Sequence, residues 1–168
     1  RRGKPIAMKE EADEACDKAD CVEKLVVVRR LERDIPWHGE HNLEWRELEC
    51  DKPVKTAQAM NSDDPMMLIY TSGTTGRPKG TVHTHCGFAI KSAFDAGFSM
   101  DLKPGDVLCW ITDMGWMMGP FLVFAASLNA ATMVIYEGTP DYPTPDRVWK
   151  LVADHAITHL GISPTLVR

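Results

Sequence analysis

The sequence lacks several features that would assign it to a broad functional class. No apolar run in its 168 residues approaches the roughly 20 residues that a membrane-spanning helix needs. The first residues are charged, whereas a secretory signal peptide contains an apolar segment. Positive charge is not in excess, because the net charge is −5, and this argues against a general nucleic-acid binder. We therefore expect neither a membrane nor a nucleic acid as a partner.

Paired metal-binding cysteines are also lacking. The five cysteines show no zinc-site spacing; they are Cys16, Cys21, Cys50, Cys86 and Cys109. An odd number without a secretory signal predicts reduced thiols in a cytoplasmic protein. His38 and His41 have no third ligand nearby in the sequence, so they are interpreted as packing or surface residues. We expect no protein-bound metal site.

The hydrophobic fraction of 44% is ordinary for a globular domain. The chain has no initiating Met and stops where a helix is beginning, so we interpret it as a piece of a longer protein, truncated at both ends. Residues 1–64 are expected to end one α/β subdomain and to include a polar connection over residues 51–64. Residues 65–168 are expected to form a second α/β subdomain of the same larger domain.

The pattern of apolar residues predicts a mostly parallel α/β fold, with a sheet flanked by helices. Thr144 is expected to cap one helix, followed by Pro145 at its first position. Asp113 is expected to cap the apolar helix at 116–128. The acidic residues of the first helix, Glu10, Glu11, Asp13 and Glu14, are expected on or near its exposed side. The strands at 22–28 and 66–70 are expected to be buried. The predicted helices are 9–19, 88–98, 116–128 and one from residue 144; the strands are 22–28, 66–70, 81–84, 107–111, 131–136 and 158–162.

Residues 71–80 are the most informative stretch of the sequence. They contain three glycines, four side-chain hydroxyls, two cations and no carboxylate. Glycines allow backbone N–H groups to gather around an anion, hydroxyls add donors, and a lysine adds charge. This composition predicts a polyphosphate-binding loop. Its candidate ligands are Thr71, Ser72, Gly73, Thr74, Thr75, Gly76 and Lys79.

The surroundings of Lys79 distinguish this loop from a Walker A loop. Pro78 precedes the lysine and Gly80 follows it, whereas a Walker A lysine is preceded by Gly and followed by Ser or Thr. β-Branched residues come next, so we expect a strand–loop–strand arrangement. A P-loop NTPase is therefore disfavoured, and so is a flexible linker, because both flanks are strand-like.

The ten residues 71–80 resemble the signature loop of the adenylate-forming (AMP-binding) superfamily. Further blocks are similar to acetyl-CoA synthetase-like enzymes: residues 2–6 with Lys9 and Asp13, then 83–84, 102–106, 112–116, 136–140, 142–143 and 163–165. The resemblance implies a piece of the large N-terminal domain of an ATP-dependent, AMP-forming ligase. A carboxylate would attack the α-phosphate of Mg-ATP, and coenzyme A would then take the acyl group. Acetate is the expected kind of acid, and acetoacetate stays open because Met117-Met118 also resembles acetoacetyl-CoA synthetases.

The resemblance also implies roles for particular residues. The loop would hold the β- and γ-phosphates of ATP, and Lys79 would offset charge on the departing pyrophosphate. Mg²⁺ would come with the nucleotide. The implied coenzyme A contacts are Arg1, Lys4, Met118 and Asp141, of which Met118 and Asp141 depart from the residues common in the family. The implied acyl pocket is lined by Trp116, Met117 and Met118.

Nothing in the sequence resembles the family's downstream adenine- and ribose-binding motifs or its C-terminal domain with the catalytic lysine. The chain by itself is therefore expected to complete neither half-reaction. A catalytically silent α/β nucleotide-binding module is the alternative from another class. The sequence indicates no oligomeric state.

Overall fold

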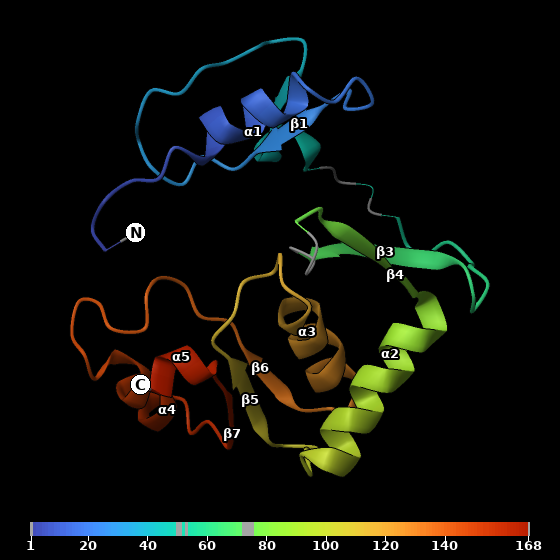
Figure 1. Cartoon of the computed structure of the whole chain (residues 1–168), viewed down its shortest axis with the longest axis vertical. Coiled ribbons are helices and arrows are strands. Elements are labelled where there is room, and N and C mark those ends of the chain that lie inside the picture. The colour runs from blue at the N-terminus through green and yellow to red at the C-terminus, as the bar shows by residue number, and fades with distance from the viewer. Residues whose placement is uncertain (1, 50–51, 53, 72–75, 168) are drawn as a thin grey trace. The chain divides into compact units, whose positions relative to one another are not determined.

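The structure is a computed structural model that describes residues 2–49, 52, 54–71 and 76–167. It divides into two compact units, Gly3–Gln58 and Ala59–Arg168, and Arg2 is grouped with the second. Figure 1 shows the elements of both units. The proposed subdomain assignment, 1–64 and 65–168, stays a prediction.

The first unit contains one helix and a short parallel sheet. Helix α1 (Met8–Cys16) is followed by β1 (Leu25–Val27), β2 (Asn42–Glu44) and a 3₁₀ turn, η1 (Trp45–Leu48). Strands β1 and β2 are parallel, with Val26 opposite Leu43. The expectation that β1 is covered on both faces is wrong, because Val26 is 42% exposed.

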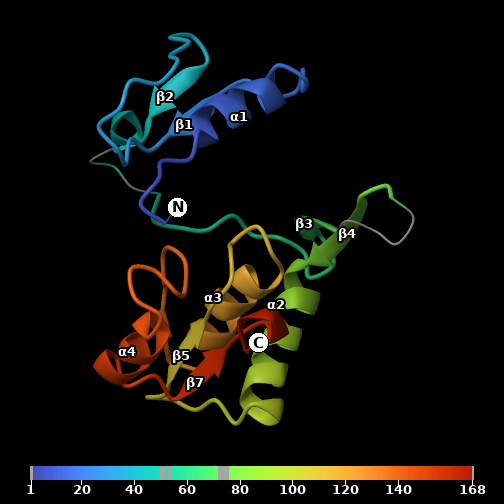
Figure 2. The same ribbon diagram turned by 60° about the vertical axis from the view of Figure 1, so that its left-hand side comes forward.

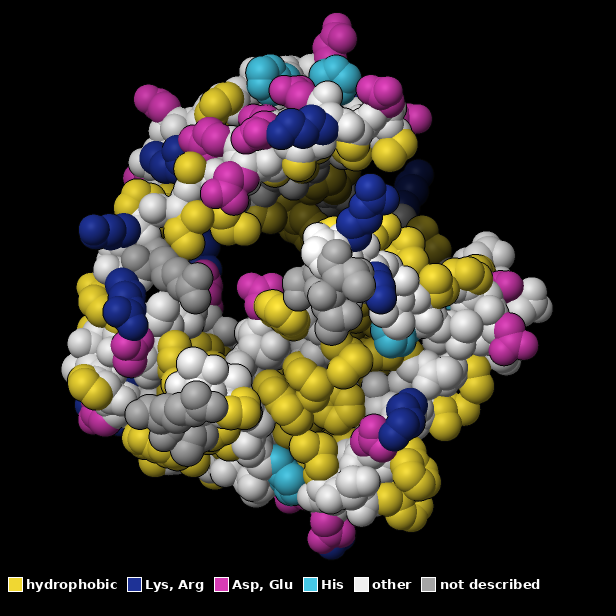
Figure 3. Space-filling model, in the orientation of Figure 1, with side chains coloured by type: hydrophobic (Ala, Val, Ile, Leu, Met, Phe, Trp, Pro, Cys, Tyr) yellow, Lys and Arg dark blue, Asp and Glu magenta, His cyan; other side chains and the backbone are white. Residues whose placement is uncertain are grey.

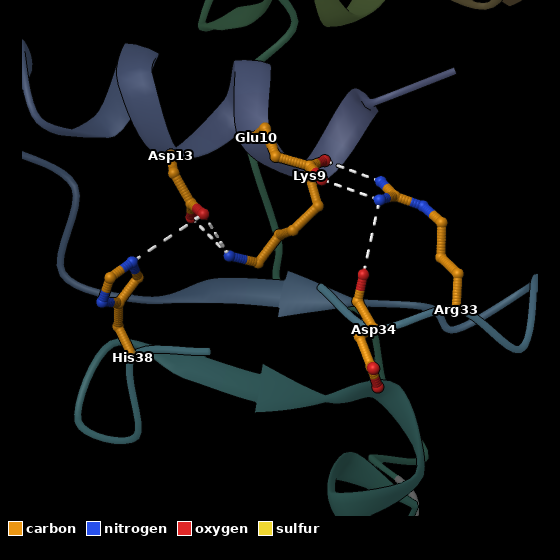
Figure 4. Close-up of polar contacts among 6 residues, drawn as sticks. All are labelled: Lys9, Glu10, Asp13, Arg33, Asp34 and His38. Carbon is orange, nitrogen blue, oxygen red and sulfur yellow. Dashed lines mark hydrogen bonds and ion pairs between the residues drawn. The ribbon is translucent and has the colours of Figure 1, made fainter. Parts of the chain in front are cut away.

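Charged side chains attach α1 to the segments that follow it (Figure 4). Lys9 is buried, and its Nζ donates to both carboxylate oxygens of Asp13 at 2.5 and 2.6 Å. With its amide oriented to satisfy its neighbours, Asn42 accepts a further hydrogen bond from Lys9 at 3.0 Å. Arg33 makes two 2.7 Å hydrogen bonds with Glu10. The expectation of an exposed acidic side is therefore wrong for Asp13, whose side chain is only 17% exposed and is paired with the buried Lys9 ammonium.

The second unit begins with an antiparallel hairpin and a helix. Strand β3 (Pro65–Thr71) pairs with β4 (Lys79–Thr84), and α2 (His85–Phe94) continues into a π-helical turn, η2 (Asp95–Ser99). Residues 66–70 are a strand, as predicted. Their predicted burial is wrong on one face, where Leu68 and Tyr70 are exposed.

A three-stranded parallel sheet in the order β6-β5-β7 forms the rest of the second unit. Its strands are β5 (Val107–Trp110), β6 (Thr132–Val134) and β7 (His159–Gly161), and its helices are α3 (Met118–Leu128), α4 (Arg147–Asp154) and α5 (Pro164–Val167). Helix α3 packs on β5 and β6, and α2 packs on α3. Helices α2 and α4 lie on opposite sides of β5 in both views (Figures 1 and 2). The predicted α/β class with a mostly parallel sheet is confirmed.

The core of this unit lies between α3 and the sheet. Leu108 on β5 and Leu122 on α3 are fully buried, and the aromatic rings of Phe88 and Phe121 pack with them. Removing such side chains from water is the main favourable term in folding. Outside this core, hydrophobic side chains remain exposed over much of the face in Figure 3. No helix in the described ranges is long and apolar enough to cross a membrane.

Two helix starts differ from their predictions. Helix α4 begins at Arg147 with Asp146 in the capping position, whereas Thr144 contributes its carbonyl to a preceding turn. Asp113 does not cap α3, which begins only at Met118. Its carboxylate instead accepts a hydrogen bond from the Gly115 backbone N–H at 2.7 Å, and this forms a local turn.

Candidate functional site

The predicted phosphate-binding loop joins the two strands of the hairpin. Thr71 is the last residue of β3, Lys79 is the first of β4, and the two lie opposite each other in the ladder. The strand–loop–strand prediction is therefore confirmed, and a Walker A loop opening into a helix is excluded. Gly76 has φ +82°, a conformation that glycine adopts without strain. Ser72, Gly73, Thr74 and Thr75 lie outside the described residues.

The base of this loop offers a positive charge to solvent. Thr71 and Lys79 are both exposed. Among the residues that the structure describes, no ion pair involves Lys79. Tyr70 lies across the hairpin from Gly80, so closely that a Cβ on Gly80 would be 3.2 Å from the ring. The ring thus packs over Gly80. The Lys79 ammonium is exposed and available to an anionic ligand.

The predicted acyl-pocket residues lie where the loop after β5 enters α3. Trp116 and Met117 are exposed, and Met118, the first residue of α3, is partly buried against the core. The loop before them packs tightly on the helix start, because a Cβ on Gly119 would be 2.6 Å from the Asp113 carbonyl oxygen. Only glycine allows this approach. The structure therefore presents the three side chains on one turn that follows the carboxyl end of β5.

The predicted coenzyme A contacts come from both units of the chain. Arg1 lies outside the described residues, and Lys4 belongs to the first unit, whereas Met118 and Asp141 belong to the second. The Asp141 carboxylate accepts a 2.5 Å hydrogen bond from Arg2, and both side chains remain about half exposed or more. The charge of Asp141 is thus already compensated.

Arg147 was missed by the sequence analysis. From the first residue of α4, its guanidinium donates to the backbone carbonyls of Thr139 (3.2 Å), Tyr142 (2.8 Å) and Glu137 (2.7 Å). It also lies over the Tyr136 ring, 4.8 Å from the centroid. These contacts fix the loop that carries Asp141. The sequence offered one indication of this role. Arg147 is a cation near a predicted helix start, where the helix dipole favours an acidic side chain, so a cation there needs another reason.

Two other features bear on what the site can hold. No group of three or more metal-binding side chains occurs in the described part of the chain. A pocket of about 170 Å³ opens in the first unit and is lined by residues including Asp13, His38 and His41. No predicted site residue lines this pocket, so we assign it no role in the candidate site.

Comparisons with known proteins agree with this arrangement. The family model described as AMP-binding enzyme matches residues 4–168. The acetyl-coenzyme A synthetase of Streptomyces coelicolor is 40% identical over the whole chain, which covers 26% of that protein. The acetoacetyl-CoA synthetase of Streptomyces lividans superposes with a TM-score of 0.86 at 28% identity, over 99% of this chain and 25% of that one.

A more distant structure shares the fold alone. The luciferase-like enzyme of the mealworm Zophobas morio has a TM-score of 0.70 at 18% identity, over 95% of this chain and 35% of that one. The chain thus spans about a quarter of the length of the curated relatives that it matches. From the family match and the whole-chain identity to its relatives, the chain belongs to the AMP-binding enzyme family.

Proposed function

We propose that the chain is part of an ATP-dependent, AMP-forming acyl-CoA synthetase that activates a short carboxylic acid such as acetate. The observation that carries this proposal is the β3–β4 hairpin, in which Thr71 and Lys79 lie opposite each other at the base of the predicted phosphate-binding loop. Similarity to acetyl-coenzyme A synthetases along the whole chain supports it. Acetoacetate is the second candidate acid, favoured by the Met117-Met118 pair and by the likeness to an acetoacetyl-CoA synthetase.

In the first half-reaction the loop would act by positioning and charge compensation. Adenylyl transfer requires these more than covalent help from the protein. Backbone N–H groups and hydroxyls of residues 71–76 would hold the β- and γ-phosphates, and Lys79 would offset charge on the departing pyrophosphate. Mg²⁺ commonly binds through substrate phosphates with one or two carboxylates. No described cluster of ligands is built for it, so we assign it no residue.

In the second half-reaction the chain would contribute part of the coenzyme A site. Arg1 and Lys4 are the cations proposed for the 3′-phospho-ADP portion. Asp141 is already paired with Arg2, so it would accept hydrogen bonds from an uncharged part of the cofactor such as an amide N–H. Met118 offers only an apolar, polarisable contact. Trp116, Met117 and Met118 would contact the acid, since they follow the carboxyl end of β5.

The remaining assignments belong to the same proposal. We propose a cytoplasmic enzyme, because an odd number of cysteines, five in these 168 residues, is typical of reduced thiols rather than of a disulfide framework. Its partners would be ATP, coenzyme A and a small acid, without nucleic acid or membrane. Adenine binding and the catalytic lysine of the second step would lie outside these 168 residues.

The deciding experiment measures carboxylate-dependent ATP–pyrophosphate exchange by the full-length protein. The acids should run from acetate and acetoacetate to longer and branched chains. We expect exchange with short acids. Exchange with none of them refutes adenylation; nucleotide binding without exchange would favour the silent module, and acid-independent phosphate release would favour an NTPase.

The role of Lys79 is tested in the same assay. Replacing one group that stabilises transition-state charge commonly costs about 100- to 1,000-fold in rate, so Lys79→Ala is expected to lower exchange by roughly that factor. Lys55→Ala, the same change at an exposed lysine in the polar connection, is the matched control and should leave the rate unchanged. An unaltered rate in Lys79→Ala would remove this side chain from the mechanism.

A further inference from the structure

An ion pair joins Arg2 to Asp141, a residue 139 positions further along the chain. The Arg2 guanidinium donates a 2.5 Å hydrogen bond to the Asp141 carboxylate, and both residues belong to the second unit. Within the described part of the chain, no other cation forms an ion pair with this carboxylate. The negative charge of Asp141 is therefore compensated by one side chain, that of Arg2.

Arg2 holds an unusual backbone conformation beside this ion pair. Its φ is +51°, in the left-handed region that residues other than glycine rarely adopt, and Gly3 follows at φ +78°. Residues in such conformations are found disproportionately at functional sites. The pair is exposed to water, with side-chain exposures of 63% for Arg2 and 49% for Asp141. Exposed ion pairs contribute little to folding stability, so stabilisation of the fold does not account for this one.

Asp141 belongs to a loop whose backbone is fixed by another arginine. Arg147 donates to the carbonyls of Thr139 at 3.2 Å and of Tyr142 at 2.8 Å, which lie on either side of Asp141 in the sequence. The Arg147 guanidinium is thus engaged by backbone oxygens. The Asp141 carboxylate has a defined position in the second unit, and Arg2 neutralises it there.

A neutralised carboxylate matters at this position because the proposed ligand is itself anionic. Asp141 is one of the contacts proposed for coenzyme A, whose 3′-phospho-ADP portion carries several negative charges. An unpaired carboxylate would repel these phosphates, and like charges that face each other at a binding surface weaken association. Arg2 lies outside the set of proposed coenzyme A contacts, so its effect on the ligand would be exerted through Asp141.

We propose that Arg2 is a positioning residue of the coenzyme A site, which neutralises and orients the Asp141 carboxylate so that a phosphate-rich ligand can bind beside it. This inference rests on the proposed acyl-CoA synthetase function. It gives a role to a residue outside the proposed set of coenzyme A contacts. It also explains how the chain carries an acidic side chain at a place where the ligand is negatively charged.

The test measures acyl-CoA formation by the full-length enzyme at varied coenzyme A, with the acid that gives the fastest ATP–pyrophosphate exchange. Arg2→Ala leaves the Asp141 carboxylate unpaired. The KM for coenzyme A is expected to rise about five- to tenfold, because an exposed charge acts on a solvated phosphate through a high dielectric, whereas kcat and the exchange rate should stay unchanged. Arg2→Lys keeps the charge and should stay near the wild-type KM. Lys18→Ala removes one charge from an exposed pair with Glu14, and as the control it should leave the KM unchanged.

A second substitution separates charge compensation from a direct contact between Arg2 and coenzyme A. In the Arg2→Ala background, Asp141→Asn removes the unpaired charge, so the KM should return toward the wild-type value. Higher ionic strength should also reduce the difference between Arg2→Ala and wild type, since salt screens exposed charges. A KM that stays raised in the double variant overturns the inference, because Arg2 would then act on the ligand directly. If Arg2→Ala does not fold, Arg2→Gly takes its place, since glycine adopts φ +51° without strain.

The outcomes separate this inference from the function on which it rests. Wild-type protein without exchange for any acid refutes the proposed function. An active, folded Arg2→Ala or Arg2→Gly enzyme with an unchanged KM for coenzyme A overturns the role of Arg2 and leaves the synthetase function standing.

Discussion

Removing the Arg147 guanidinium should release the loop that it binds. Arg147 donates to three carbonyl oxygens, those of Glu137, Thr139 and Tyr142, at 2.7 to 3.2 Å. A hydrogen bond to a charged group contributes about 1.5–3 kcal/mol net. Only the bond to Thr139 is partly buried, and water would replace much of the other two. We therefore expect Arg147→Ala to destabilise the observed conformation of the loop over residues 137–143 by about 2–3 kcal/mol.

That free energy corresponds to a large local change in dynamics. At 1.36 kcal/mol per factor of ten, the loop would open about 30- to 150-fold more often. Hydrogen exchange of the full-length protein, followed by mass spectrometry on the peptide over residues 137–143, reports this opening directly. Arg147→Lys should recover little of the protection, since an ammonium lacks the planar fork that reaches several carbonyls.

Lys150 provides the matched control for this experiment. It lies on the same helix and makes an exposed ion pair with Asp146 at 2.8 Å. Exposed pairs of this kind contribute little, so Lys150→Ala should leave exchange in residues 137–143 unchanged. Wild-type exchange rates in Arg147→Ala would refute the reasoning, because the three hydrogen bonds would then not determine the loop conformation.

Two further predictions concern individual titratable groups. Hydrogen bonding to Arg33 lowers the pKa of Glu10 from 4.5 to about 2, so the stability that this pair contributes is present above pH 4.5 and lost as pH falls through about 2. Arg33→Gln should return the Glu10 pKa toward 4.5 in an NMR titration, and an unmoved pKa would contradict the assignment. Burial raises the pKa of Cys109, which is fully buried, whereas Cys21 is exposed. Iodoacetamide should therefore label Cys21 long before Cys109 in native protein, and equal labelling would contradict the observed packing.

The parts of the structure that depend on neighbouring residues in sequence could be predicted. The hairpin follows from apolar and β-branched residues on both sides of a glycine-rich loop. The buried strand β5 follows from its continuous apolar run, and two of its residues are indeed fully buried. The parallel sheet follows from the alternation of strands and helices.

The burial of Lys9 could not be predicted, because its partners come from different parts of the chain. Lys9 and Asp13 are spaced as an ordinary surface pair on a helix. Asn42, which completes the hydrogen bonding of the ammonium, comes from β2, far along the sequence. Without that third partner, burial of the pair would be unfavourable, and a solvated face is the reasonable expectation.

The helix starts were mispredicted because capping residues are also turn residues. Asp113 and Thr144 can each either cap a helix or take part in a turn. At Asp113, close packing of the backbone against Gly119 places the turn before the helix. At Thr144, the helix begins where Arg147 reaches the carbonyls of the preceding loop. In both cases a tertiary contact determines which of two locally acceptable conformations forms.

The same reasoning explains why the site residues divide into two kinds. Lys79 and Met117, which the sequence patterns proposed as site residues, have exposed side chains. Gly119 and Arg147 instead fix backbone positions through contacts with other segments. Substituting the first kind should change a rate or an affinity without changing local protection from exchange. Substituting the second kind should change the rate or affinity together with local protection from exchange, because the geometry of the site depends on those contacts.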